Sequence, residues 1–242
     1  MSPSPPRLLE PEQIALRAGE DWPRLLLPSR AEVFAARALR LRELSAGHAM
    51  RDYLLFLALL CEAQHEALQR HPEVPLPTQA QLDAAAREGR PALSASALHA
   101  AWPRDARWRQ SLRGLLDAVL ARLPDSSPAC RGVQAVRDAD DDWLEQQADR
   151  LQGGVTLGLD VASAPLVAAG LQLYWTHLVI ATGAAHAKAR PAELPAAAFG
   201  FADDPSRCPC CGSLPSVSLT RIGGEVEGYR YLHCSLCSAQ WH

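Results

Sequence analysis

The chain has 242 residues, of which 48% are hydrophobic and 21% are charged. That composition is sufficient for the buried core of one large domain and one smaller domain, and it argues against a disordered chain. The formal net charge is only −3, which argues against nucleic acid or an anionic membrane surface as the main partner.

Residues 1–28 are rich in proline, which interrupts helices, so we predict an extended arm that wraps the body and contains one short helix near 11–18. The residues after Met1 lack the apolar run of a signal peptide, so we expect a cytoplasmic protein. In that reducing compartment, C-x-x-C pairs are more often metal ligands or redox-active thiols than structural disulfides.

Residues 29–190 are predicted to form a helical domain. Ser29 and Glu32 form a capping-box pattern in front of the first amphipathic repeat. A second helix is predicted over 49–69, and its residues 53–61 are apolar on every face. Because nine residues cannot span a bilayer, we expect this to be a central core helix.

Further helices are predicted downstream, separated by loops that contain proline or glycine. The first is capped by Thr78 and runs to about Glu88. The others cover Ser94 to about Ala101, Arg104 to about Leu123, Pro128 to about Leu151, and Pro165 to Ala189. The last is long and mostly apolar, but its polar residues, such as Gln172 and His177, would need protein partners in lipid. We therefore expect a buried helix and no membrane span.

After a linker predicted over 191–204, residues 205–242 contain two C-x-x-C pairs separated by 22 residues. A C-x-x-C turn brings two sulfurs together with backbone N–H groups directed at them, and a second such turn completes a tetrahedral four-sulfur site. The predicted ligands of one metal ion are Cys208, Cys211, Cys234 and Cys237. Zinc and iron both suit four thiolates, and the alternative is that the cysteines only pack or form disulfides.

Three further features belong to this ribbon. Residues 215–220 alternate like a half-exposed strand, Gly223 and Gly224 suit a turn, and 228–233 return as a second strand. Gly212 permits the positive φ that such a turn needs. Cys210 is predicted to be a bystander whose side chain points away from the metal.

Tyr229, Arg230 and Tyr231 have two interpretations. They form either an exposed partner surface or the packing of the hairpin with a solvated arginine.

Other polar residues carry little sign of chemistry. Residues 140–142 are three successive aspartates that face different directions on a helix, so a solvated surface is expected. Cys61 lies in an apolar run and is expected to be an inert buried thiol, whereas Cys130 near a loop lacks an identified basic partner. The remaining candidates, which lack a second ligand at metal-binding spacing, are His65, His177 and His186.

No nucleophile elbow, P-loop or dinucleotide fingerprint is present, so no motif proposes a reaction. Together with the resemblance described below, this leads us to expect a protein that is not an enzyme. Two hypotheses follow from the residues alone. The first is a binding and maturation factor with a metal ribbon. The second is a redox protein, either a rubredoxin-like electron carrier or a thiol–disulfide exchanger.

The ribbon also resembles the core of the formate dehydrogenase accessory protein family, FdhE. The resemblance is carried by C-P-C-C-G-S-L-P at 208–215, G-Y-R-Y-L-H-C-S-L-C at 228–237, and Trp241-His242. Weaker similarities of order and spacing extend upstream through most of the chain. They lie at Arg7–Pro11, Val33–Leu41, Tyr53–Phe56, Ala63–Gln64 and Ala168–Trp175.

The resemblance implies a cytoplasmic accessory protein that binds the catalytic subunit of a respiratory formate dehydrogenase and supports its assembly before export. It also implies a rubredoxin-like site associated with iron. The expected fold is a mainly α-helical domain followed by a small rubredoxin-like or zinc-ribbon β domain, α+β overall.

Members of that family continue past Trp-His into two further C-x-x-C pairs, whereas this sequence ends at His242. In a chain that ends at His242, almost no sequence follows Trp241 to cover its side chain. We therefore expect a C-terminally truncated version or a longer gene product. The resemblance does not decide whether the two pairs share one metal or pair with the absent ones.

Overall fold

The computed structural model describes residues 23–95, 101–124, 126–189, 198–220 and 230–242. The helices in these ranges are α2 (Ala35–Ser45), α3 (Arg51–Gln69), α4 (Gln79–Arg87), α5 (Arg107–Leu120), α6 (Pro128–Asp138), α7 (Asp141–Gly153) and α8 (Ala164–Ala189). The strands are β1 (Leu25–Leu26), β2 (Pro215–Thr220), β3 (Arg230–Cys234) and β4 (Gln240–Trp241). The predicted fold class, a helical body followed by a small β region that contains four clustered cysteines, is confirmed.

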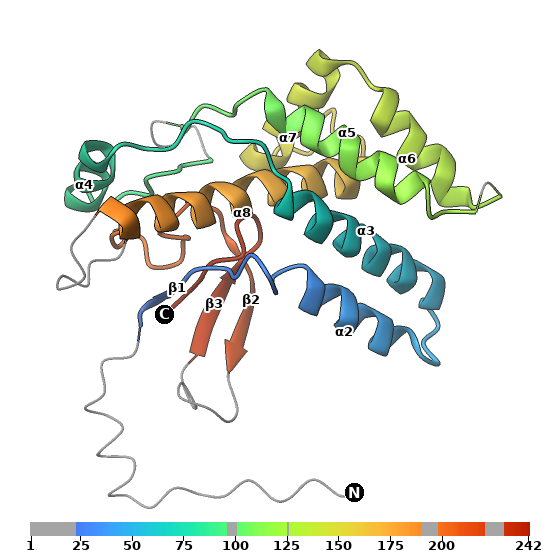
Figure 1. The fold of residues 1–242 in the computed structure, drawn as a ribbon, viewed down its shortest axis with the longest axis horizontal. Coiled ribbons are helices and arrows are strands. Elements are labelled where there is room, and N and C mark those ends of the chain that lie inside the picture. Colours follow the sequence, from blue (N-terminus) through green and yellow to red (C-terminus); the bar gives the residue numbers. More distant parts are fainter. Residues whose placement is uncertain (1–22, 96–100, 125, 190–197, 221–229) are drawn as a thin grey trace, which may run out of the picture.

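Helix α8 crosses the middle of the molecule, with α5, α6 and α7 on one side of it and the small sheet on the other (Figure 1). Its residues Leu173, Tyr174 and Trp175 are almost completely buried. A Cβ atom on Gly170 would lie 2.9 Å from Leu112 Cδ1, so the absent side chain permits the close approach of α5. Among the described residues, α8 alone has the length and composition for a membrane crossing, but 67% of its most apolar window is buried, as in a core helix.

The start of α2 differs from the prediction. The N-cap is Phe34, and it makes no side-chain capping hydrogen bond. The carbonyl of Ser29 instead accepts hydrogen bonds from the N–H groups of Glu32 and Val33, so a separate turn precedes the helix. The predicted capping box at Ser29 is therefore wrong, whereas Thr78 does cap α4 through a reciprocal capping box with Gln81.

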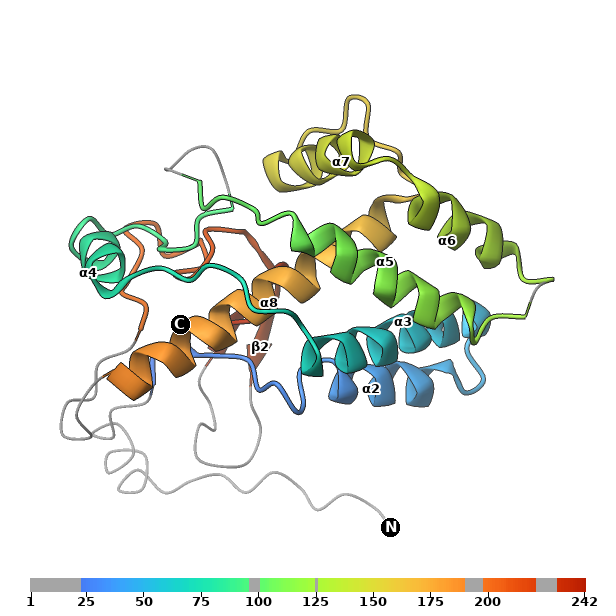
Figure 2. The ribbon, with the colours of Figure 1, turned by 45° about the horizontal axis from the view of Figure 1, so that its top comes forward.

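The single helix predicted over 128–151 is also wrong, because the chain breaks between α6 and α7. Ala139 is extended, with ψ 145°, and the Asp140 carboxylate accepts the N–H of Trp143 at 2.7 Å to start a new helix. Asp141 then forms ion pairs with Arg109 and Arg113 of α5. The break lets α7 turn away from the direction of α6 (Figure 2).

The four strands form one antiparallel sheet in the order β1-β4-β3-β2. Leu25 and Leu232 are both partners of Trp241, so a strand from the N-terminal part of the chain borders the C-terminal strand. Trp241 is only 5% exposed, and its Nε1 donates to the Pro205 carbonyl at 2.8 Å. The expectation that Trp241 lies uncovered is therefore wrong.

Tyr231 is buried in the sheet, and its hydroxyl donates to the carbonyl of Pro23 at 2.9 Å, so the packing interpretation holds for this residue. Arg230 is exposed. Several predictions lie partly or wholly outside the described residues. They are the first part of the arm with its short helix, the helix from Ser94 to Ala101, the first half of the linker, the Gly223-Gly224 turn, and Tyr229.

Candidate metal centre

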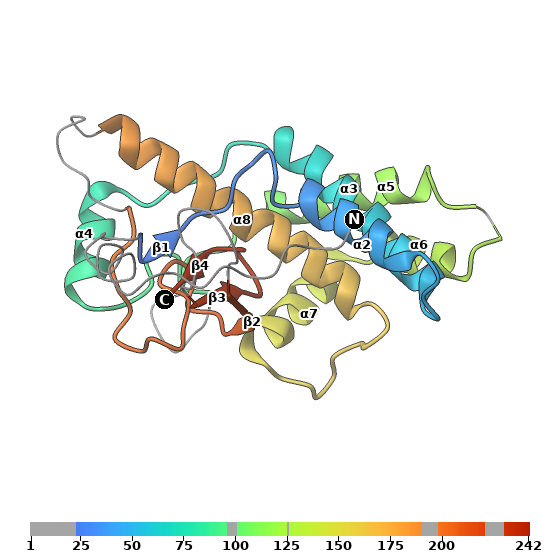
Figure 3. The ribbon, with the colours of Figure 1, turned by 90° about the horizontal axis from the view of Figure 1, so that it is seen from below.

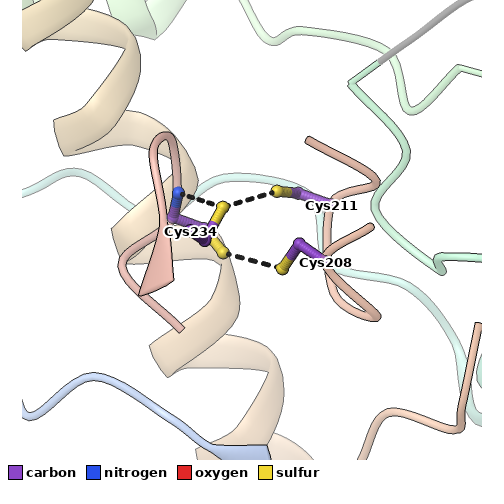
Figure 4. A group of neighbouring side chains, drawn as sticks. Cys208, Cys211 and Cys234 are labelled. Atoms are coloured by element: carbon purple, nitrogen blue, oxygen red, sulfur yellow. Dashed lines mark hydrogen bonds between the residues drawn. The ribbon is translucent and has the colours of Figure 1, made fainter. Parts of the chain in front are cut away.

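The first C-x-x-C turn is closed by its own backbone. The N–H of Gly212 donates to the Cys208 carbonyl at 2.8 Å, and the N–H of Cys208 donates to the Ser213 carbonyl at 3.0 Å. Gly212 has a φ of +73°, as predicted from its position after the cysteine pair. The turn therefore presents Cys208 and Cys211 on the same side of a tight loop (Figure 4).

The second turn repeats this geometry. The N–H of Cys234 donates to the Ala239 carbonyl at 2.9 Å, and Ser238 has a φ of +62°. Backbone N–H groups of Leu236 and Cys237 each point at Cys234 Sγ from 3.3 Å. Sequence reasoning missed Ser238, although it follows its cysteine pair at the same spacing as Gly212.

The two turns bring four buried sulfurs together. All four lie within 4.8 Å of one another, with Cys208 Sγ 3.5 Å from Cys237 Sγ and Cys211 Sγ 3.4 Å from Cys234 Sγ. These separations exceed a disulfide bond, and all the cysteines are free thiols. A tetrahedral site with metal–sulfur bonds of about 2.3 Å has sulfurs roughly 3.8 Å apart. The four cysteines are therefore positioned to bind one metal ion.

Burial and neighbouring thiols shift the pKa values of three of these cysteines. Burial, followed by hydrogen bonds with neighbouring thiols, raises the pKa of Cys211 and of Cys237 well above the ordinary value. Burial also acts to raise the pKa of Cys208, but hydrogen bonds from the surrounding thiols lower it well below the ordinary value. Buried thiolates repel one another, and a metal ion bound between them would offset that repulsion.

Cys210 lies outside the group of four, although it is completely buried. Burial, and then the neighbouring Cys208, raise the pKa of its thiol well above the ordinary value. Its carbonyl accepts the N–H of Leu93 at 2.9 Å, and the next carbonyl, of Cys211, accepts the N–H of Ala95 at 2.9 Å. The backbone of the helical body thus holds the first turn.

Side chains of the helical body hold the second turn. Gln172 on α8 donates through Nε2 to the Ser235 carbonyl at 2.9 Å, and Arg37 on α2 reaches Ser238 Oγ at 3.4 Å. Arg37 and Gln64 also contact Gln172 Oε1, which fixes the orientation of its amide. These supports could not be predicted, because each joins residues more than sixty positions apart.

The other candidates stay apart from this centre. His65, His177 and His186 do not belong to the one group of metal-ligating residues found in the described ranges. His177 instead stacks on His71, with ring centroids 4.1 Å apart, and burial lowers its pKa to about 3. Cys61 is buried, and burial raises the pKa of its thiol, as expected for an inert cysteine.

The fold and the site together define a class of protein. It has a helical body, and a ribbon with four clustered cysteines packs against the central helix. The family models are more specific, since the model for the FdhE N-terminal region matches residues 22–191 and the model for the FdhE central domain matches 207–242. The chain belongs to the FdhE family, which confirms the resemblance seen in the sequence.

Individual relatives agree with this assignment. An FdhE homologue from Klebsiella pneumoniae is 34% identical over 227 residues, which are 93% of this chain and 67% of that protein. The FdhE protein of Salmonella arizonae is 33% identical over 227 residues, with the same coverage of both proteins. The crystal structure of FdhE from Pseudomonas aeruginosa matches with a TM-score of 0.66 at 30% identity, and the match covers 91% of this chain and 69% of that one.

Proposed function

We propose that this chain is a cytoplasmic accessory protein that binds the catalytic subunit of a respiratory formate dehydrogenase and supports its assembly. The observation that carries the proposal is membership of the FdhE family, with matches in both the helical region and the ribbon. Membership supports a formate dehydrogenase accessory role, and binding to the catalytic subunit is the finer step that we add. In this role the protein acts by binding and does not itself turn over a substrate.

We further propose that Cys208, Cys211, Cys234 and Cys237 ligate one metal ion. The grouping and burial of their sulfurs support this assignment, as do the N–H groups directed at Cys234 Sγ. The resemblance favours iron, and zinc fits the same four thiolates. A bound ion would tie the two turns together and fix the sheet against α8, so metal binding contributes to folding of the ribbon.

Co-purification tests the proposed binding. The affinity-tagged chain is mixed with the catalytic subunit of a formate dehydrogenase without oxygen, and size-exclusion chromatography is expected to recover a complex of the two. The same experiment with the Cys234→Ser variant asks whether the metal centre is needed. Recovery of the two proteins only as separate species, in both oxidised and reduced buffers, argues against the proposal.

A redox-active centre is the second candidate. Two backbone N–H groups within 3.3 Å of Cys234 Sγ favour it, because N–H···S bonds stabilise thiolates and set the potential of an iron centre. Disulfide reduction or electron transfer at enzymatic rates, without complex formation in any redox state, would favour this candidate over the accessory role.

A further inference from the structure

The outer edge of β2 has no neighbouring strand in the described part of the chain. β2 is the last strand of the sheet, and in the described part of the chain it pairs with β3 alone. An irregularity lies between Pro215 and Val217, and beyond it the pairing is regular to Thr220. Exposed strand edges are usually protected by charged residues, proline or a bulge. In β2 the proline and the irregularity lie at the start, and 216–220 contain neither a charge nor a proline. Val217 is 49% exposed.

A cleft of about 490 Å³ opens at the start of this strand. Its apolar walls come from Leu151 at the end of α7, Leu171 of α8, and Leu214 and Leu236 beside the two cysteine turns. Leu214 is 56% exposed, although it borders the metal site. Figure 3 shows that β2 is the strand nearest to α7, so the free edge and the cleft lie on the same side of the sheet.

Gln152 gives the cleft a polar anchor. Its Oε1 accepts from the Arg104 guanidinium, and because arginine only donates, this contact fixes which way the amide points. The other end, Nε2, is buried and has no hydrogen-bond partner among the described residues. Gln152 also lines an adjoining cavity of about 570 Å³, so it stands where the two cavities meet. A carbonyl oxygen is the group that would satisfy this donor.

We propose that the free edge of β2 and the cleft at its start bind an extended, uncharged segment of the partner polypeptide. A strand edge and a lone amide donor both recognise peptide backbone, and the leucine walls suit one bulky apolar side chain. The nearby cations are already paired, Arg207 with Asp204 and Arg104 with Glu145 and Asp149, so no charge on the segment is required. The inference rests on the proposed function, because it takes the partner to be the catalytic subunit.

The position of this surface links it to the metal centre. Gly212, Ser213, Ser235 and Leu236 line the cleft, and they belong to the two cysteine turns or follow them directly. Loss of the metal would release those turns and change the cleft wall. Binding of the segment therefore depends on an intact metal centre.

Two charged substitutions on exposed residues and one substitution at the partly buried Gln152 test the proposal. Leu214→Glu and Val217→Lys place a charge in the cleft and on the strand edge, and Gln152→Glu removes the amide donor. Leu157→Glu, at a leucine that is 86% exposed in the loop between α7 and α8, is the matched control. Each variant is first checked for unchanged metal content and thermal midpoint.

Affinity for the purified catalytic subunit is then measured by calorimetry. We expect each of the three test variants to bind about tenfold more weakly, the effect of one lost buried contact or hydrogen bond, while the control binds like the wild type. Hydrogen exchange should also show protection of the amides of 214–220 in the complex. Wild-type affinity in all three test variants would overturn this inference and leave the proposed function standing, whereas a wild-type chain that binds no catalytic subunit would overturn both.

Sedimentation tests whether a second copy of this chain, and not the catalytic subunit, pairs with the edge of β2. If the wild type is a dimer that Val217→Lys converts to a monomer, the edge is an interface between two copies and the proposal is wrong. A wild type and variant with the same mass in solution support the proposed partner.

Discussion

Replacing Trp241 tests whether the N-terminal strand and the body cover the end of the sheet. The side chain is 5% exposed, lies between the partners Leu25 and Leu232, and donates to the Pro205 carbonyl. A buried tryptophan removes about 150–250 Å² from water, which corresponds to roughly 4–6 kcal/mol as an upper limit. Because large-to-small core changes cost about 3–5 kcal/mol, we expect Trp241→Ala to lower the free energy of unfolding by about 4 kcal/mol.

Urea unfolding of the metal-saturated protein, followed by circular dichroism, gives this number. Trp241→Phe is the matched control, since it keeps most of the apolar contact and loses the hydrogen bond to Pro205, so a loss of only about 1–2 kcal/mol is expected. A loss below about 1 kcal/mol for Trp241→Ala would show that the indole is not covered as described. It would refute the pairing of β1 with β4 as a source of stability.

Two further predictions concern the cysteine turns and acid stability. Gly212→Ala should lower the free energy of unfolding by about 1 kcal/mol or more, since φ is +73° there. Ser238→Gly should change it by less than about 0.5 kcal/mol, because the relief of a positive φ of +62° is offset by the lost contact between Oγ and Arg37. Equal urea midpoints for the two variants would contradict this. His177 lies beside Arg30 and His71, and its pKa is lowered from 6.5 to about 3, mainly by burial. As the pH falls below 6.5, the unfolded state therefore binds a proton that the folded state does not, and the free energy of unfolding decreases. The expected slope is up to about 1.4 kcal/mol per pH unit, and His177→Gln should reduce it in urea titrations between pH 6.5 and 5.5; an unchanged slope would show that His177 does not titrate on unfolding.

Much of the site could be predicted because its signals are local. The spacing of the two C-x-x-C pairs, and Gly212 after the first, depend only on how a tight turn directs its sulfurs and N–H groups. The long apolar segment that forms α8, and the cap at Thr78, are likewise predictable from neighbouring residues.

The rest depends on contacts between distant residues. Asp140 starts a new helix where the hydrophobic pattern continues without interruption, and its capping role becomes visible only from the extended Ala139 before it. Leu25 pairs with Trp241 across most of the chain, and no local pattern predicts such a pairing. Gln172 and Arg37 look like ordinary helical residues until the ribbon is placed on α8.

Counting metal in protein purified without oxygen tests the central claim most directly. We predict one tightly bound metal ion per chain in the wild type and in Cys210→Val, and loss of stoichiometric metal in Cys234→Ser. Mass spectrometry of the metal, together with the visible absorption of the same samples, identifies iron or zinc. A wild-type chain without bound metal, or a Cys234→Ser variant that keeps a full equivalent, would contradict the four-cysteine centre.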